Sequence, residues 1–155
     1  MSLAIEIVVE SGLIKVDLDA IKRAEARIIE ISTATPSQAL ELEAFFMLSM
    51  SHLVDQIADV NLAFKRAEFE AERVKAMIML DLNEDGSKKA TNADIRKSLV
   101  FMNKDYMAAL DKANQLEALL TWLKDKKEVI NKAYFGAKDI IAVNDGMNLG
   151  GHINA

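Results

Sequence analysis

The chain has 155 residues, one proline, six glycines and 51% hydrophobic residues, a composition typical of one folded, mainly helical domain. It has no cysteine, which excludes a disulfide framework and a thiol nucleophile. The net charge of −5 conceals an asymmetry: residues 1–64 hold four basic and ten acidic side chains, whereas residues 65–138 hold fifteen basic and twelve acidic ones.

Two short strands and a short helix are predicted at the N-terminus. Residues 3–9 are rich in β-branched side chains, Glu10-Ser11-Gly12 reads as a turn, and Leu13 to Val16 reads as a second strand, which together predict a small β-hairpin over 3–16. An isolated hairpin is marginal in water, so it must lie on the helices or pair with a neighbouring subunit. A short helix over 18–32, capped by Asp17 or Asp19, follows.

A long helix is predicted over 36–82. Thr35 stands at the N-cap position, Pro36 at the first helical position and Gln38 at the third, which is a strong helix start. Apolar residues then recur at strict 3-4 spacing, as in a helix that lies along another helix. These positions are Phe46, Met50, Leu53, Ile57, Val60, Phe64, Ala67, Ala71, Val74 and Ile78.

A second long helix is predicted over 91–143, with Thr91 and Asp94 resembling a capping box. Its seam is apolar except at Lys127, and at about 1.5 Å per residue the helix would extend about 75 Å. A polar turn over 83–90 joins the two helices, so the fold class is mainly α, a long antiparallel, coiled-coil-like hairpin. The seam positions are Ile95, Leu99, Met102, Tyr106, Ala109, Ala113, Leu116, Leu120, Leu123, Lys127, Ile130, Tyr134, Ala137 and Ile141.

A second apolar stripe on each long helix exceeds what a two-helix seam can cover. The helix at 18–32, another protomer, or both must therefore lie on it. On the first long helix the stripe is Leu40, Ala44, Met47 and Val54. On the second it is Leu119, Trp122, Val129, Ala133 and Ile140, which we assign to an oligomer interface. The tail 144–155 has glycines and no periodicity, and we expect it to be flexible.

No catalytic set, metal site or cofactor motif is predicted, and we expect a protein that is not an enzyme. Asp81-x-Asn83-x-Asp85-Gly86 matches the first half of a calcium loop, but Lys88 and Asn92 stand where its second half needs an apolar residue and a carboxylate. His52 has Asp55 and Gln56 at i+3 and i+4, and a surface histidine explains this pattern better than a metal ligand.

Basic side chains form the best candidate site. Arg66 and Arg73 are two helical turns apart, as are Lys97 and Lys104. Phe69, Phe101 or Tyr106 offers a ring for stacking, although Tyr106 lies on the seam and is expected in the core. The alternative is that these cations form ordinary surface pairs, Arg66 with Glu70 and Lys75 with Glu72. The full candidate set for nucleic-acid binding is Arg66, Arg73, Lys75, Lys88, Lys89, Arg96, Lys97 and Lys104.

Residues 64–143 resemble the UvsY-like recombination mediators of tailed phages. The resemblance lies in Phe64-Lys65-Arg66-Ala67 to Lys75-Ala76, an Asp-Gly turn, and a second helix with four further motifs. These are Ile95-Arg96-Lys97-Ser98-Leu99, Asp105-Tyr106, Leu119-Leu120-Thr121-Trp122-Leu123 and Ile130-Asn131-Lys132. The resemblance implies a non-enzymatic, ring-like homo-oligomer that binds single-stranded DNA and helps a recombinase load.

Two functions are therefore expected as alternatives. The first is an oligomeric, single-stranded-DNA-associated recombination accessory protein of phage type. The second is a structural or protein-binding helical adaptor with no affinity for nucleic acid. The N-terminus has no basic lead before an apolar run, and the uncharged run Ala44 to Val54 is about half of a membrane span, so we expect a cytoplasmic protein. Together with the resemblance, this implies a phage or prophage protein in the host cytoplasm.

Overall fold

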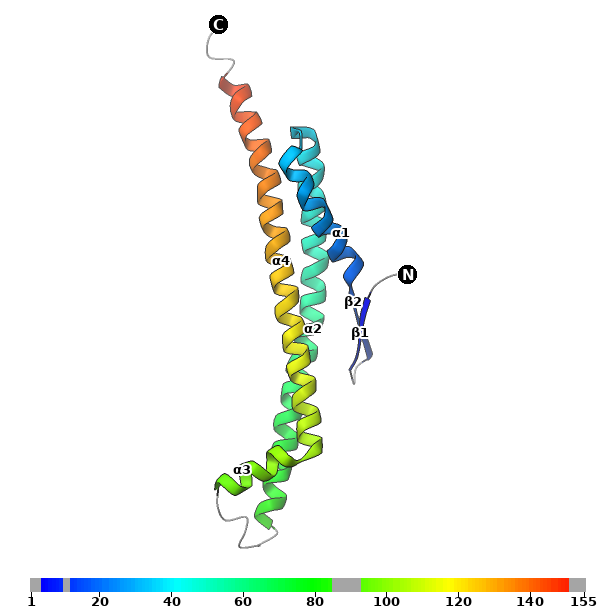
Figure 1. Cartoon of the computed structure of the whole chain (residues 1–155), viewed down its shortest axis with the longest axis vertical. Coiled ribbons are helices and arrows are strands. Elements are labelled where there is room, and N and C mark those ends of the chain that lie inside the picture. Colours follow the sequence, from blue (N-terminus) through cyan, green and yellow to red (C-terminus); the bar gives the residue numbers. More distant parts are fainter. Residues whose placement is uncertain (1–3, 10–11, 85–92, 151–155) are drawn as a thin grey trace. The chain divides into compact units, whose positions relative to one another are not determined.

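The computed structural model describes residues 4–9, 12–84 and 93–150 (Figure 1). Most of the predicted 83–90 turn lies outside these ranges, together with Lys88, Lys89 and the second half of the candidate calcium loop. None of the described helices is long and apolar enough to cross a membrane.

The N-terminal segment forms a β-hairpin that leads directly into a helix. Strands β1 (Ala4–Val9) and β2 (Gly12–Asp17) pair antiparallel, with Ile7 opposite Ile14. Helix α1 (Leu18–Ile28) begins where the Asp17 carboxylate accepts a 3.0 Å hydrogen bond from the amide of Ala20, and a 3-10 helix, η1 (Ile29–Thr33), continues it. Asp17 satisfies one of the amides that every helix start leaves without a partner in the helix.

Helix α2 (Pro36–Glu84) begins at the predicted cap. The Thr35 amide donates to Oε1 of Gln38 at 2.9 Å, and the Gln38 amide donates to Oγ1 of Thr35 at 3.4 Å. This reciprocal pair of hydrogen bonds is a capping box. The predicted seam is confirmed at five of its ten positions, whereas the other five, Met50, Ile57, Phe64, Val74 and Ile78, are only partly buried. The five buried positions are Phe46, Leu53, Val60, Ala67 and Ala71.

The single helix predicted over 91–143 is wrong at Asn103. The structure has α3 (Ala93–Met102) and α4 (Lys104–Gly150) instead, and Asn103 itself is not helical. Its Oδ1 accepts hydrogen bonds from the amides of Asp105 at 2.9 Å and Tyr106 at 3.1 Å, so it is the N-cap of α4. Before the break the predicted seam fails, because Met102 is 78% exposed.

The flexible tail predicted from residue 144 is also wrong over its first part. Helix α4 continues through Gly146 and ends at Gly150. Glycine costs a helix interior only about 1 kcal/mol relative to alanine, so one such residue does not end a long helix.

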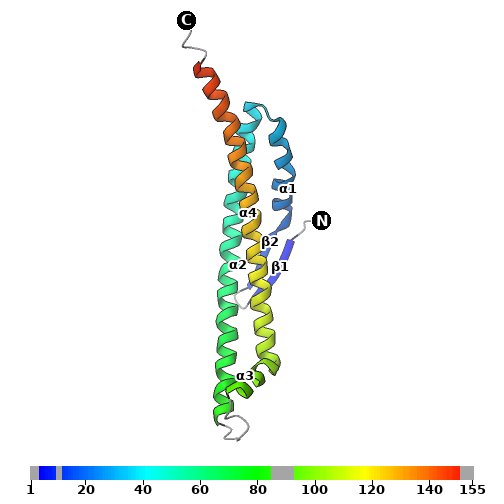
Figure 2. The ribbon, with the colours of Figure 1, turned by 60° about the vertical axis from the view of Figure 1, so that its left-hand side comes forward.

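Helices α2 and α4 pack closely as a hairpin and run side by side in both views (Figures 1 and 2). Where the sequence predicts one domain, the chain divides into two compact units: the first holds residues 1–58 and 122–155, and the second holds residues 59–121. Each unit therefore contains its own part of both long helices, with its own core.

In the first unit α1 and η1 cover one side of α4. Nζ of Lys126 lies 2.6 Å from Oε1 of Glu25, and a Cβ at Gly136 would lie 3.6 Å from Cγ2 of Ile31. Ala133 stands between these two contacts on the same helix face and is 5% exposed. The short helix therefore covers part of the second apolar stripe of α4.

The second unit has a core where α3 meets the two long helices. Ala71, Val100 and Tyr106 form its buried centre. The Tyr106 ring packs edge-on against Phe101, with centroids 5.7 Å apart. Around them pack the partly buried Val74, Ile78, Met79, Leu82, Ala109 and Leu110.

Candidate nucleic-acid interface

The described part of the second unit presents an exposed stripe on α2 in which two arginines alternate with apolar side chains. Its members recur every three or four residues, so they share one face of the helix. Phe69 at its centre is 72% exposed, which is unusual for a ring of that size. We call this face the arginine–phenylalanine stripe; it consists of Leu62, Arg66, Phe69, Arg73, Met77 and Leu80.

Within the stripe, Arg73 is held in place by its own helix. Its Nε and Nη2 each lie 2.7 Å from an oxygen of Glu70, and its Nη1 lies 3.6 Å from Sδ of Met77. The hydrogen bonds from Arg73 lower the pKa of Glu70 below its ordinary value of 4.5. Arg73 is thereby fixed in orientation before any ligand arrives.

Arg66 is arranged differently from Arg73. The predicted ion pair between Arg66 and Glu70 is wrong, because Glu70 is engaged by Arg73. The predicted pair between Lys75 and Glu72 is confirmed at 3.1 Å. Arg66 is exposed and forms no ion pair with any residue that the structure describes, so its guanidinium is open to an external anion.

The remaining predicted cations differ in how far they reach solvent. Lys97 and Lys104 are exposed, whereas Arg96 is partly buried with its Nε out of contact with water. Phe101, between the two lysines in sequence, is 57% exposed. Residues 59–121 hold ten basic and eleven acidic side chains in sequence, so binding of an anion depends on local contacts and not on a long-range field.

The residues of the predicted oligomer interface are only partly exposed on the surface of the chain. Trp122 is 36% and Val129 42% exposed, while Leu119 and Ile140 are partly buried. Ala133 is wrong as an interface residue, because it is buried within the chain and only 5% exposed.

A metal site and the surroundings of His52 were the other candidates among the described residues. Among them, no three side chains of the His, Cys, Asp or Glu types gather closely enough to hold a metal. His52 bonds to Gln56, with Nε2 atoms 3.0 Å apart, and lies 4.0 Å from the Asp17 carboxylate. Gln56 is 7% exposed, and its Oε1 is buried without a hydrogen-bond partner in the described structure.

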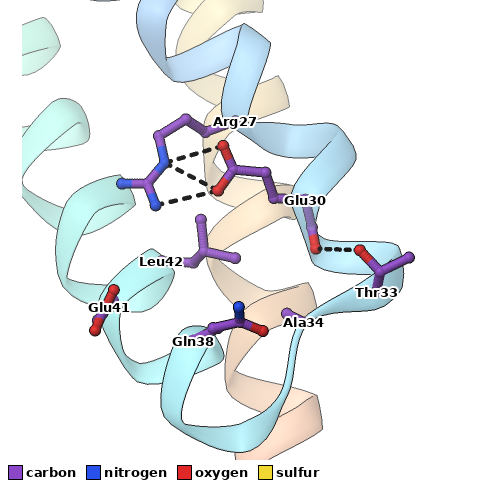
Figure 3. Close-up of a pocket in the computed structure, with 7 residues that line it drawn as sticks. All are labelled: Arg27, Glu30, Thr33, Ala34, Gln38, Glu41 and Leu42. Carbon is purple, nitrogen blue, oxygen red and sulfur yellow. Dashed lines mark hydrogen bonds and ion pairs between the residues drawn. The ribbon is translucent and has the colours of Figure 1, made fainter.

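A small cavity lies where η1 turns into α2 (Figure 3). Its volume is about 240 Å³, and its guanidinium, that of Arg27, donates to both oxygens of Glu30 at 3.1–3.4 Å. Because its cation is already neutralised by its neighbour, the cavity offers little to an anionic ligand. Its lining residues are Arg27, Glu30, Thr33, Ala34, Gln38, Glu41 and Leu42.

Comparison of the chain with protein-family models, with curated proteins and with solved structures finds no match.

Proposed function

We propose that this chain is a non-enzymatic, self-associating protein that binds single-stranded DNA without reading its sequence, in the manner of a phage recombination mediator acting in the host cytoplasm beside a recombinase. The observation that supports the proposal best is the arginine–phenylalanine stripe. The exposed Phe69 ring offers a surface for base stacking. The exposed guanidinium of Arg66, which forms no ion pair with any described residue, offers a cation for a phosphate, whereas Arg73 is already engaged by Glu70.

The geometry of the stripe suits an unpaired strand better than a duplex. Arg66 and Arg73 are seven residues apart, which is about 10 Å along the helix axis, with Phe69 between them. In a duplex the base faces are stacked on each other and unavailable to a side-chain ring, whereas an unpaired base can lie on Phe69. Because every base has a π-face, such contacts discriminate little between sequences.

The test is fluorescence anisotropy of a labelled single-stranded oligonucleotide over a salt series. Phe69→Ala should weaken binding roughly 5- to 150-fold, as expected for the loss of one stacked base at about 1–3 kcal/mol. Phe135→Ala is the matched control, because Phe135 is 51% exposed on α4 of the first unit, outside the stripe. No binding at low ionic strength, or equal effects of the two substitutions, would contradict the proposal.

The phosphate contacts are tested by the salt dependence. Each phosphate neutralised on a single strand contributes about 0.7 to the slope of log affinity against log salt. Arg66→Ala should therefore lower that slope by about 0.7, and Lys97→Glu with Lys104→Glu should weaken binding further. Arg96 is left unchanged, because its partly buried guanidinium makes a folding defect hard to separate from a binding defect.

A protein-binding adaptor is the second candidate, and α3 supports it. Its exposed face carries Ile95 and Leu99, which are 44% and 39% exposed, and Met102 is 78% exposed. Apolar side chains gathered in this way mark protein contacts. The absorbance ratio of the purified chain separates the two candidates, since a nucleic-acid-binding protein retains nucleic acid and an adaptor does not.

A further inference from the structure

The first unit leaves an apolar stripe of α2 uncovered. Leu40 is 55%, Met47 54% and Val54 43% exposed, and the core residues Leu42 and Leu53 stand on other sides of the helix. The chain's own short helix does not cover this stripe, because it meets α2 elsewhere: Arg27 lies 4.6 Å from the ring centroid of Phe45, and Asp17 approaches His52. The exposed small residues Ala44, Ser51 and Ala58 complete the stripe.

Acidic side chains accompany this stripe. Between residues 36 and 58, α2 carries Glu41, Glu43 and Asp55 and no lysine or arginine. Within the described structure none of the three forms an ion pair. Pairing of this face with the same face of another copy would bring carboxylates together, which is unfavourable.

The neighbouring part of α4 has the opposite character. Residues 122–138 hold five lysines against two acidic residues. Lys126 and Lys132 are paired with Glu25 and Glu128, whereas Lys124 and Lys127 form no ion pair with any described residue.

Lys124 and Lys127 line an open groove. The groove has a volume of about 510 Å³, and Ile57 of α2 contributes an apolar wall to it, along with Glu128 and Asn131 of α4. Lys127 is the one polar position of the predicted seam, and here it is exposed at the groove instead of buried between helices.

We infer that a second copy of this chain docks on the groove, with the acidic apolar stripe of α2 in one copy lying against Lys124 and Lys127 of the other. The inference rests on the self-association part of the proposed function and names the surfaces that carry it. It depends on complementary charge: the stripe carries carboxylates, the groove carries the ammonium groups of Lys124 and Lys127, and within the described part of one copy these charges form no ion pair. Met47 and Val54 lose contact with water when the two faces join, which supplies the hydrophobic part of the free energy.

The test uses light scattering of the full chain after size-exclusion chromatography at micromolar concentration. One variant reverses the acids, Glu41→Lys with Asp55→Lys, and another reverses the bases, Lys124→Glu with Lys127→Glu. All four side chains are exposed, so each variant should keep its helicity by circular dichroism. Each alone should associate at least tenfold more weakly than the unmodified chain, and an equimolar mixture of the two should regain association.

Met47→Asp provides a second test of the same surface, because a carboxylate placed in the apolar stripe should abolish association. Its matched control is Val129→Asp, on the face of α4 assigned to assembly from the sequence. A monomeric unmodified chain, a mixture that stays dissociated, or association lost only in Val129→Asp would overturn the inference. DNA binding is measured separately, so a chain that assembles as described without binding DNA refutes the proposed DNA binding and leaves this inference standing.

Discussion

Substitution of Asn103 by alanine tests the break between α3 and α4. The substitution removes Oδ1, which accepts from the amides of Asp105 and Tyr106 at 2.9 and 3.1 Å. Loss of such an N-cap costs about 1 kcal/mol, within a range of about 0.5–2 kcal/mol. For a chain of this size that corresponds to a fall in Tm of about 2–4 °C.

Two further substitutions separate capping from helix propensity. Asn103→Asp keeps an acceptor at the cap and adds a negative charge at the helix N-terminus, so it should be close to neutral or slightly stabilising. Asn114→Ala changes an exposed residue inside α4, where exchange of Asn for Ala should stabilise the helix by up to about 0.7 kcal/mol. The same chemical change should therefore have opposite signs at positions 103 and 114.

The measurement is urea unfolding followed by circular dichroism at 222 nm. A stability of Asn103→Ala equal to or above that of the unmodified chain would refute the reasoning, because it would mean that the helix runs uninterrupted when the cap is absent. In an unbroken helix Val100 and Tyr106 would point about 120° apart. They could not then both be buried in the cluster around Ala71.

Three more predictions address the core, a helical glycine and an ion pair. Leu123→Ala, at a side chain that is 0% exposed, should lower the free energy of unfolding by about 3–5 kcal/mol in urea titrations, whereas a loss below about 1 kcal/mol would mean that Leu123 is not in the core. Gly136→Ala should raise Tm, because the added Cβ meets its nearest neighbour at an ordinary 3.6 Å and helix propensity improves by about 1 kcal/mol; a lower Tm would show that the contact is already too close. Arg73→Gln should return the pKa of Glu70 toward its ordinary 4.5 in a carboxyl NMR titration, since Arg73 lowers it. The stabilising effect of that pair is present above pH 4.5 and is lost as the pH falls through the lowered pKa.

Local sequence signals predicted the start of α2 and many of the buried positions of α2 and α4, although not the buried Gln56. Thr35, Pro36 and Gln38 act within one turn, so their meaning does not depend on the rest of the chain. The 3-4 spacing likewise identified Leu53 and Leu123, because only one face of a helix can pack against its partner.

The break at Asn103 could not be inferred from spacing, because Leu99 and Met102 continue the pattern across it. The competing local signal was an asparagine followed two residues later by Asp105 in the first turn of a helix, which is typical of an N-cap. Tertiary packing decided between the two signals: α3 buries Val100, and Leu99 stays exposed.

The candidate site was predictable in its charges and not in its pairing. The positions of Arg66 and Phe69 on an exposed face follow from helix periodicity. Whether Glu70 pairs with Arg66 or with Arg73 depends on the side-chain rotamers, because a carboxylate on a helix can reach cations at both i+3 and i−4. The contact of the short helix with α4 at Lys126 joins segments about a hundred residues apart, which no local pattern encodes.

The buried amide of Gln56 has a consequence for how α1 is aligned along α2. An apolar seam that repeats every seven residues packs nearly as well after one helix slides by a heptad. Apolar side chains alone therefore allow several alignments of two packed helices. The Gln56 amide is bonded to His52, which in turn faces the carboxylate that starts α1, so sliding α1 along α2 by a heptad would separate His52 from Asp17. The buried amide thereby costs some stability and disfavours the alignments that are shifted by a heptad.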